Sequence, residues 1–136
     1  MKKIRLGKDI IMTWQILTND LPEDLEGRDL TLILTDPANG RQELPITVTG
    51  NTVEAVYQGT EQKYTGGYSI TLIENRGKKG QSIVDQYNAF YLVPWSEQEE
   101  DGEGLGSSLV QLSTAYKLDI HYSVIKKINE VNLKND

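Results

Sequence analysis

Cysteine is absent from the chain, and histidine occurs once, as His121. Without cysteine the chain forms no disulfide and offers no thiolate to a metal, which fits a reducing cytoplasm. Zinc sites and catalytic triads need partners beside a histidine, and His121 falls on the polar side of an alternating segment. We therefore interpret it as a surface residue and predict neither a metal site nor a cofactor.

Long apolar runs and an excess of basic residues are missing too. The run Ile10–Met12 is too short for the core of a signal peptide, and nothing approaches the ~20 apolar residues of a membrane span. The chain has 14 lysines and arginines against 20 aspartates and glutamates, for a net charge of -6. Nucleic acids and anionic membranes attract basic surfaces. We therefore expect no nucleic-acid partner and no membrane insertion.

Helical periodicity is scarce before residue 95, where short segments alternate apolar and polar residues. Turn-forming residues separate these segments, which lie at 10–16, 30–35, 68–72 and 82–93. The clearest signal is the hairpin "ITVTGNTVEAVY", because a Gly50-Asn51 loop suits a primed two-residue turn. About six or seven short strands, spaced every ~8–12 residues, are typical of an all-β sandwich.

A glycine pair, Gly66-Gly67, stands directly before Tyr68 at the start of one such strand. Glycine permits a sharp turn into the strand, and the tyrosine can then bury its ring and bond its hydroxyl to the loop "QGTEQKY". Immunoglobulin-type sandwiches carry such a tyrosine corner. The alternative is that Tyr68 is one more strand aromatic after an ordinary glycine loop.

These patterns predict an immunoglobulin-like antiparallel β-sandwich over residues 1–95. The following residues are expected in its core: Trp14, Leu32, Leu34, Val48, Val53, Tyr68, Ile70, Leu72 and Phe90. Residues 96–108 are acidic and glycine-rich, and they read as a flexible linker. Residues 109–136 form a C-terminal strand extension and tail.

The extension alternates strictly from 110 to 124, so we prefer a strand, although a helix can be drawn through part of it. One strand of that length would span roughly 50 Å at ~3.3 Å per residue, so we expect a bend or break. Its apolar row supplies the predicted assembly residues Val110, Leu112, Tyr116, Leu118, Ile120 and Tyr122, continued by Val124. A lone strand with such a face must join a sheet, either in its own sandwich or in a neighbouring chain. We predict a homo-oligomer.

Other residues capable of chemistry do not form a recognisable motif. The acidic group within 97–103 lacks the spacing of a calcium-binding loop, and the acidic residues at 20–26 are interpreted as a polar loop. Surface aromatics can stack on sugars, and the candidates are Trp14, Tyr57, Tyr64, Tyr87, Tyr91 and Trp95. We expect Trp14 in the core, whereas Trp95 is a candidate for packing between domains or subunits.

Four stretches carry a family resemblance: "IRLGKDIIMTWQI", "DLEGRDLTLILTD", "VTGNTVEAVY" and "YTGGYSITLIEN". Together they resemble phage tail and baseplate proteins from prophages of Bacteroides-type gut bacteria. The layout is similar to the N-terminal immunoglobulin-like domain of phage upper baseplate proteins and covers residues 4–95. The segment "SLVQLSTAYKLDI" also fits that family. These motifs are strand and turn patterns, not catalytic signatures.

The resemblance implies a non-enzymatic structural or adaptor protein of the virion tail, with receptor binding as a further role. It would be assembled in the cytoplasm of the bacterial host, and other tail or baseplate proteins would be its partners. The alternative is a carbohydrate-binding β-sandwich module of a gut bacterium, and a host-surface glycan is a partner under either hypothesis. A small hydrolase that uses the acidic loops is the least favoured function.

Overall fold

The computed structural model describes residues 1–99 and 115–125, with side chains as far as Ile120. Within these residues the chain forms ten β-strands and one 3-10 turn, η1 (Gly59–Glu61). The strands are β1 (Lys2–Arg5), β2 (Ile10–Thr18), β3 (Leu21–Pro22), β4 (Leu30–Thr35), β5 (Arg41–Leu44), β6 (Ile46–Thr49), β7 (Thr52–Tyr57), β8 (Gly66–Glu74), β9 (Ser82–Val93) and β10 (Tyr116–Ile125).

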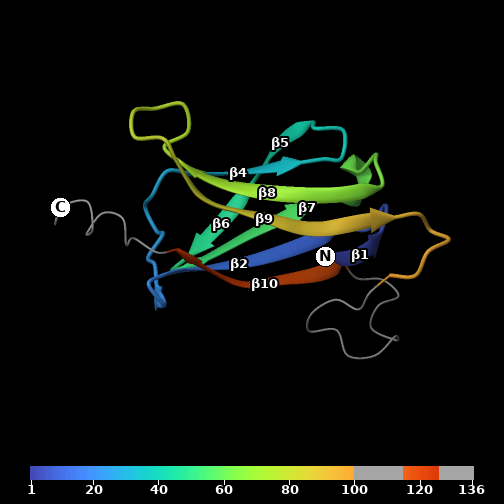
Figure 1. Ribbon diagram of the computed structural model, residues 1–136, viewed down its shortest axis with the longest axis horizontal. Helices are drawn as coiled ribbons and strands as arrows, with labels where there is room; N and C mark the ends of the chain where they lie inside the picture. Colours follow the sequence, from blue (N-terminus) through green and yellow to red (C-terminus); the bar gives the residue numbers. More distant parts are fainter. Residues whose placement is uncertain (100–114, 126–136) are drawn as a thin grey trace, which may run out of the picture.

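Two five-stranded sheets pack face to face (Figure 1). The β8 sheet has the strand order β1-β9-β8-β4-β5, and the β2 sheet has the order β10-β2-β7-β6, with the short β3 paired to β2. The expected all-β sandwich is therefore confirmed. The chain passes from one sheet to the other between β5 and β6, where Pro45 separates the two edge strands.

One of the two outer strands of each sheet departs from the antiparallel arrangement that the sequence predicts. β1 pairs in parallel with the end of β9, from Lys2 opposite Phe90 to Arg5 opposite Val93. β10 likewise runs parallel to β2. Parallel neighbours cannot be joined by a tight turn, and these pairs join segments that are far apart in the chain. Alternation within one segment carries no information about the direction of so distant a partner.

The β6–β7 hairpin forms where the sequence predicts it. Val48 pairs with Val53 and Thr49 with Thr52, so Gly50 and Asn51 make a two-residue loop. Gly50 has φ of 59°, and glycine at the first central position suits a primed turn.

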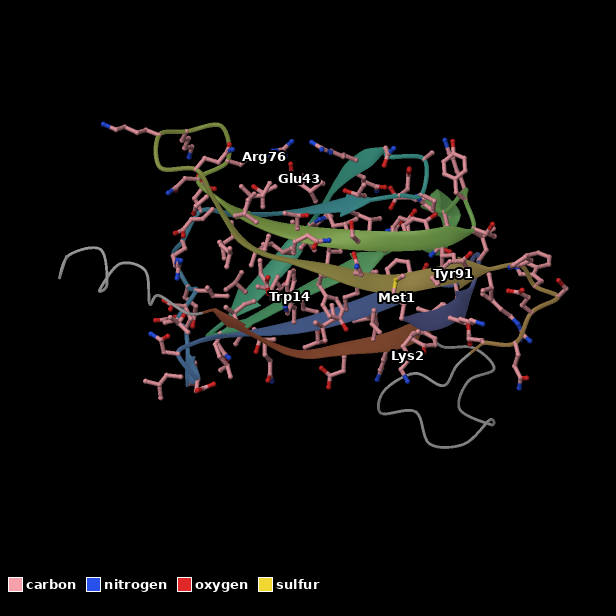
Figure 2. All side chains as sticks on the ribbon, in the orientation of Figure 1. Met1, Lys2, Trp14, Glu43, Arg76 and Tyr91 are labelled. Atoms are coloured by element: carbon pink, nitrogen blue, oxygen red, sulfur yellow. The ribbon has the colours of Figure 1, made fainter. Side chains whose placement is uncertain are left out.

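The core lies between the sheets and contains nearly all of the predicted residues. Trp14 is 1% exposed, and Figure 2 shows it between the two layers. Val48 is the exception among the nine predicted residues, because it is only partly buried at the edge of the cluster. The core also receives Tyr116, Leu118 and Ile120 from β10, so β10 belongs to the same packed unit as the sandwich.

Candidate assembly strand and the corner that positions it

β10 lies along the edge of β2 that faces away from β7 (Figure 1). Its inward residues stand opposite the inward residues of β2, in the pairs Tyr116–Ile10, Leu118–Met12 and Ile120–Trp14. The exposed fractions of Tyr116, Leu118 and Ile120 are 1%, 5% and 2%. Burying a large apolar side chain contributes ~1.5–3 kcal/mol, so these three residues add substantially to the stability of the sandwich.

The structure describes the side chains of three of the six predicted assembly residues, and all three are buried: Tyr116, Leu118 and Ile120. Tyr122 lies on β10, but its side chain is outside the described part of the chain. Val110 and Leu112 fall in the segment 100–114, which is also outside the described residues. In this single chain the strand pairs with its own β2, which is one of the two choices that the sequence leaves open.

The pairing of β10 with β2 is interrupted once. Regular register runs from Tyr116 to Ile120, shifts, and resumes with Ser123 opposite Ile16. Such an irregularity bends a strand and increases its local twist. It is the kind of interruption expected for an alternating run of this length, and it leaves Tyr116–Ile120 as the regular part of β10.

β10 begins against the turn between β1 and β2. The Tyr116 N–H donates to the Asp9 carbonyl at 2.7 Å. The Lys8 ammonium group pairs with Glu99 Oε1 at 2.6 Å and lies 6.0 Å from the centre of the Tyr116 ring. Glu99 and Tyr116 therefore meet the same turn, although 100–114 separates them in the sequence.

Residues 97–99, the start of the predicted linker, are fixed to β1. The Arg5 N–H donates to Glu99 Oε2 at 3.0 Å, and Arg5 Nε donates to the Glu97 carbonyl at 2.9 Å. We call the group of Arg5, Lys8 and Glu99 the clasp. The rest of the predicted linker, 100–108, lies outside the described residues.

The same turn is fixed from its other side by η1 and the residue after it. Gln62, which is 8% exposed, accepts from the Gly7 N–H at 2.6 Å and donates to the Lys8 carbonyl at 2.7 Å. Asp9 Oδ1 accepts from the Gly59 N–H at 2.7 Å. A Cβ atom on Gly59 would lie 2.1 Å from the Gly7 carbonyl oxygen, so only glycine fits. Sequence reasoning missed Gln62, because a single glutamine in a polar loop gives no signal of burial.

Tyr68 lies near the start of β8, with its ring in the core. The ring is 2% exposed, stacks on Phe90 with centroids 5.1 Å apart, and lies beside Tyr57. Its hydroxyl donates to the Tyr64 carbonyl at 2.5 Å, four residues upstream. Gly66 has φ of 127°, and a Cβ atom there would lie 2.8 Å from Pro37. Burial raises the pKa of Tyr68 above its ordinary value.

Among the side chains that the structure describes, the exposed aromatic residues do not form one row. Trp95 is 77% exposed, with its indole N–H donating to the Leu6 carbonyl at 2.7 Å. Tyr91 lies beside Met1 on the outer side of β9 (Figure 2). Tyr87 instead stands opposite the buried Ile70, and its ring lies 6.4 Å from that of Trp14. Tyr87 and Tyr91 project from different faces of β9, because a bulge at Ala89 inserts one extra residue between them.

Tyr64, an exposed aromatic residue, borders a hollow lined mainly by polar side chains. This depression of about 440 Å³ lies at the end of the sandwich, between the β4–β5 loop and the η1 loop. Its other polar lining residues are Asp36, Arg41, Gln42, Tyr57, Glu61 and Lys63. Planar carboxylate, amide and guanidinium groups next to an aromatic ring can bind hydroxyl-rich ligands through hydrogen bonds and ring contact.

The acidic residues at 20–26 that belong to the loop after β3 stabilise that loop. Glu23 accepts from Arg28, whose guanidinium also makes two hydrogen bonds to Glu74, at 2.7 and 3.0 Å. The hydrogen bonds to Glu74 are the main reason that the pKa of Arg28 is raised. Glu26 accepts from the Gly50 N–H. The polar-loop interpretation therefore agrees with these contacts.

Among residues 1–99 and 115–125, no group of three or more His, Cys, Asp or Glu side chains is arranged to hold a metal ion. The described part of the chain also contains no helix that is long and apolar enough to span a membrane. Comparison with known proteins finds no matching family model, no similar curated protein and no similar solved structure.

Proposed function

We propose that the chain is a non-enzymatic structural and adaptor protein of a phage tail or baseplate. The sequence resemblance over residues 4–95 supports this role, and the position of β10 supports the part of the proposal that concerns assembly. β10 is a separate strand that completes the sandwich by adding to the open edge of β2. Strand addition is a recurring way to join protein subunits, so the same edge suits assembly with tail proteins or with further copies of this chain.

We also propose that the sandwich is of the immunoglobulin-like type. With β2, β7 and β6 as strands B, E and D, and β4, β5, β8 and β9 as strands C, C′, F and G, both sheets follow that order. Tyr68 is then the tyrosine corner at the start of strand F. β10 takes the place of strand A beside strand B, but it runs parallel to its neighbour. Cross-strand nuclear Overhauser contacts between β2 and both β7 and β10 test this assignment.

Homo-oligomerisation belongs to this proposal. Glu99 and Tyr116, the described residues nearest the two ends of the segment 100–114 that meet the Lys8–Asp9 turn, lie close to each other. A connection of this length gives β10 access to its own β2 and to that of a neighbour. Light scattering coupled to size exclusion measures the outcome, and a monomer at every concentration contradicts homo-oligomerisation.

The test of the tail role is whether the protein is present in purified virions. Phage particles are induced from the bacterium that carries the gene, purified by density gradient, and analysed by mass spectrometry. We expect the chain in the virion fraction at a fixed ratio to known tail proteins, and antibody labelling at the tail. Its absence from intact, infectious particles contradicts the proposal.

The second candidate function is carbohydrate binding, which the depression beside Tyr64 favours. A host-surface glycan is the ligand that both hypotheses share, because a tail adaptor with this depression would bind the receptor there. A glycan array probed with the native chain and with Tyr64→Ala tests it. We expect binding that the substitution removes, with Tyr91→Ala as the control at a separate exposed tyrosine. If tail genes flank the gene, the adaptor role is favoured, whereas a polysaccharide-utilisation cluster favours the module.

A further inference from the structure

β10 is the outermost strand of the β2 sheet, and no other described strand pairs with its second edge. The backbone directions along this edge follow from one hydrogen bond. The Tyr116 N–H points toward β2, where it donates to Asp9. Because the N–H and C=O groups of one strand residue point to the same side and alternate along the strand, those of Lys117 and Asp119 point outward. The backbone groups of these two residues therefore lie on the side of β10 that faces away from β2.

The two residues that present the edge also carry opposite charges. The Lys117 side chain is exposed and that of Asp119 is half-buried, and both project from the outer face of the sheet. Leu118, between them, points into the core with 5% exposure. The regular part of β10 runs from Tyr116 to Ile120, so Leu118 is its central residue.

We propose that two copies of the chain pair edge to edge through β10, antiparallel, around a two-fold axis at Leu118. In this register Lys117 of one copy stands opposite Asp119 of the other, and the symmetry repeats the contact. Both positions are the hydrogen-bonded type of antiparallel pair, so they exchange about four backbone hydrogen bonds. Leu118 meets its own copy at the axis, and Tyr116 faces Ile120 on the inner side. The pairing joins the two β2 sheets into one continuous sheet.

Charge selects this register over its neighbours. A shift of two residues in one direction centres the pair on Lys117 and places two ammonium groups opposite each other. The same shift in the other direction centres the pair on Asp119 and places two carboxylates opposite each other. Like charges directly opposite destabilise a sheet, whereas opposite charges stabilise it. A shift of one residue turns the apolar face outward. The bend after Ile120 keeps the regular contact short, so we expect a weak dimer, with Kd on the order of 10–100 µM.

This inference deepens the proposed function, because it names a second copy as the partner and the edge of β10 as the contact. It differs from strand exchange, in which β10 of one copy would replace that of the other on β2. In a dimer formed by strand exchange, Lys117 and Asp119 occupy the same positions relative to β2 as they do within one chain. A charge reversal therefore separates edge pairing from exchange.

The test is charge reversal at the two edge positions, with the full chain studied by sedimentation equilibrium over a wide range of concentration. Lys117→Asp places Asp opposite Asp, and Asp119→Lys places Lys opposite Lys, so each single variant should weaken the dimer by about tenfold or more. The double variant restores opposite charges and should dimerise like the native chain. An equimolar mixture of the two single variants should form a heterodimer, although neither variant associates alone.

Matched controls carry the same charge changes at distant exposed sites. Lys63→Asp lies in the loop before β8 and Glu43→Lys on the β5 edge, and both should leave the dimer unchanged. Circular dichroism and thermal unfolding establish that each variant is folded. Equal dimerisation by both single variants overturns edge pairing in favour of strand exchange or another face. A monomeric native chain also overturns it and indicates that the two charges protect the edge from association. Neither result bears on presence in virions, which tests the tail role separately.

Discussion

β8 and β10 present nearly the same inward pattern to the core in very different settings. β8 buries Tyr68, Ile70 and Leu72, and β10 buries Tyr116, Leu118 and Ile120 in the same alternation. β8 is a central strand with β4 on one side and β9 on the other, whereas β10 has β2 as its single neighbour among the described strands. An inward apolar row therefore reports which face a strand buries, but not how many neighbours the strand has.

The residues between the apolar ones distinguish the two strands. β8 places Ser69 and Thr71 on its outer face, and both are half-buried between flanking strands. β10 places Lys117 and Asp119 in the equivalent positions. Charged side chains are a common feature of edge strands. The outward residues thus carry the information about the edge that the inward row lacks.

Removal of β10 is expected to have the largest effect. A chain that ends at Glu99 loses three buried side chains, on the order of 5 kcal/mol before ordering costs, and exposes the edge of β2 and part of Trp14. Because small domains are stable by only ~5–15 kcal/mol, we expect the truncated chain to unfold at low denaturant or to aggregate. Equilibrium denaturation, followed by tryptophan fluorescence, measures the loss.

A synthetic peptide of residues 115–125 provides the control for that truncation. If β10 acts only by filling its place beside β2, the peptide added in trans should restore part of the lost stability. A peptide with Leu118→Asp should not. A truncated chain as stable as the native one would show that β10 is dispensable for the sandwich.

The next largest effect on the free energy of unfolding is expected from shortening a buried leucine in each of the two strands. Leu72 is fully buried in the central strand and Leu118 is 5% exposed at the edge. Leucine-to-alanine changes in cores cost ~2–5 kcal/mol, depending on how far the site can collapse. We expect about 4 kcal/mol for Leu72→Ala and about 2 kcal/mol for Leu118→Ala in urea denaturation. Equal costs would contradict the distinction between central and edge settings.

The tyrosine of β8 supplies a smaller effect. Tyr68→Phe removes the hydrogen bond to the Tyr64 carbonyl, and a lost buried hydrogen bond costs ~1–2 kcal/mol. The raised pKa of Tyr68 also sets the direction of a pH effect, because its ordinary value is 10.0. Above about pH 10 the unfolded chain loses the proton while the folded chain keeps it, so the stability falls as the pH rises. Denaturation at pH 8 and pH 11 should show a smaller decrease for Tyr68→Phe than for the native chain.

The sequence predicts a large part of the sandwich because its signals are local. The alternation around Trp14, Leu32 and Leu72 identifies the buried faces, and Gly50-Asn51 identifies a hairpin. The parallel pairing of β1 with β9 and of β10 with β2 was not predicted. It depends on contacts between distant segments, which no local pattern specifies.

The site was predicted in part for the same reason. The apolar row points to Tyr116, Leu118 and Ile120, and the need for a sheet follows from the burial of that row. The anchoring of the strand was missed, since it requires Gln62 and Gly59 of one loop to meet the Lys8–Asp9 turn of another. Glu99 looked like one of several linker carboxylates, and only its position beside Lys8 distinguishes it.

Weakening the clasp is expected to have the smallest effect on stability. The clasp lies where β10 begins, and β8 has no part in it. β10 follows Glu99 in the chain after the segment 100–114, and Glu99 contacts the turn at which β10 begins. The Lys8 and Glu99 side chains are 29% and 15% exposed, so the pair is partly protected from solvent. We expect Glu99→Gln to cost about 0.5–1 kcal/mol at low salt and less in ~1 M salt.

The matched control is Asp29→Asn, because the Lys78–Asp29 pair has the same 2.6 Å separation but side chains that are 68% and 42% exposed. That change should be near neutral, since exposed pairs contribute little. Hydrogen exchange adds a readout that is local to each strand. With the clasp weakened, the amides of β10 should exchange faster while those of β8 keep their rates, because β10 begins at the Lys8–Asp9 turn and β8 does not. Equal acceleration in both strands would mean that the clasp stabilises the whole sandwich rather than the entry of β10.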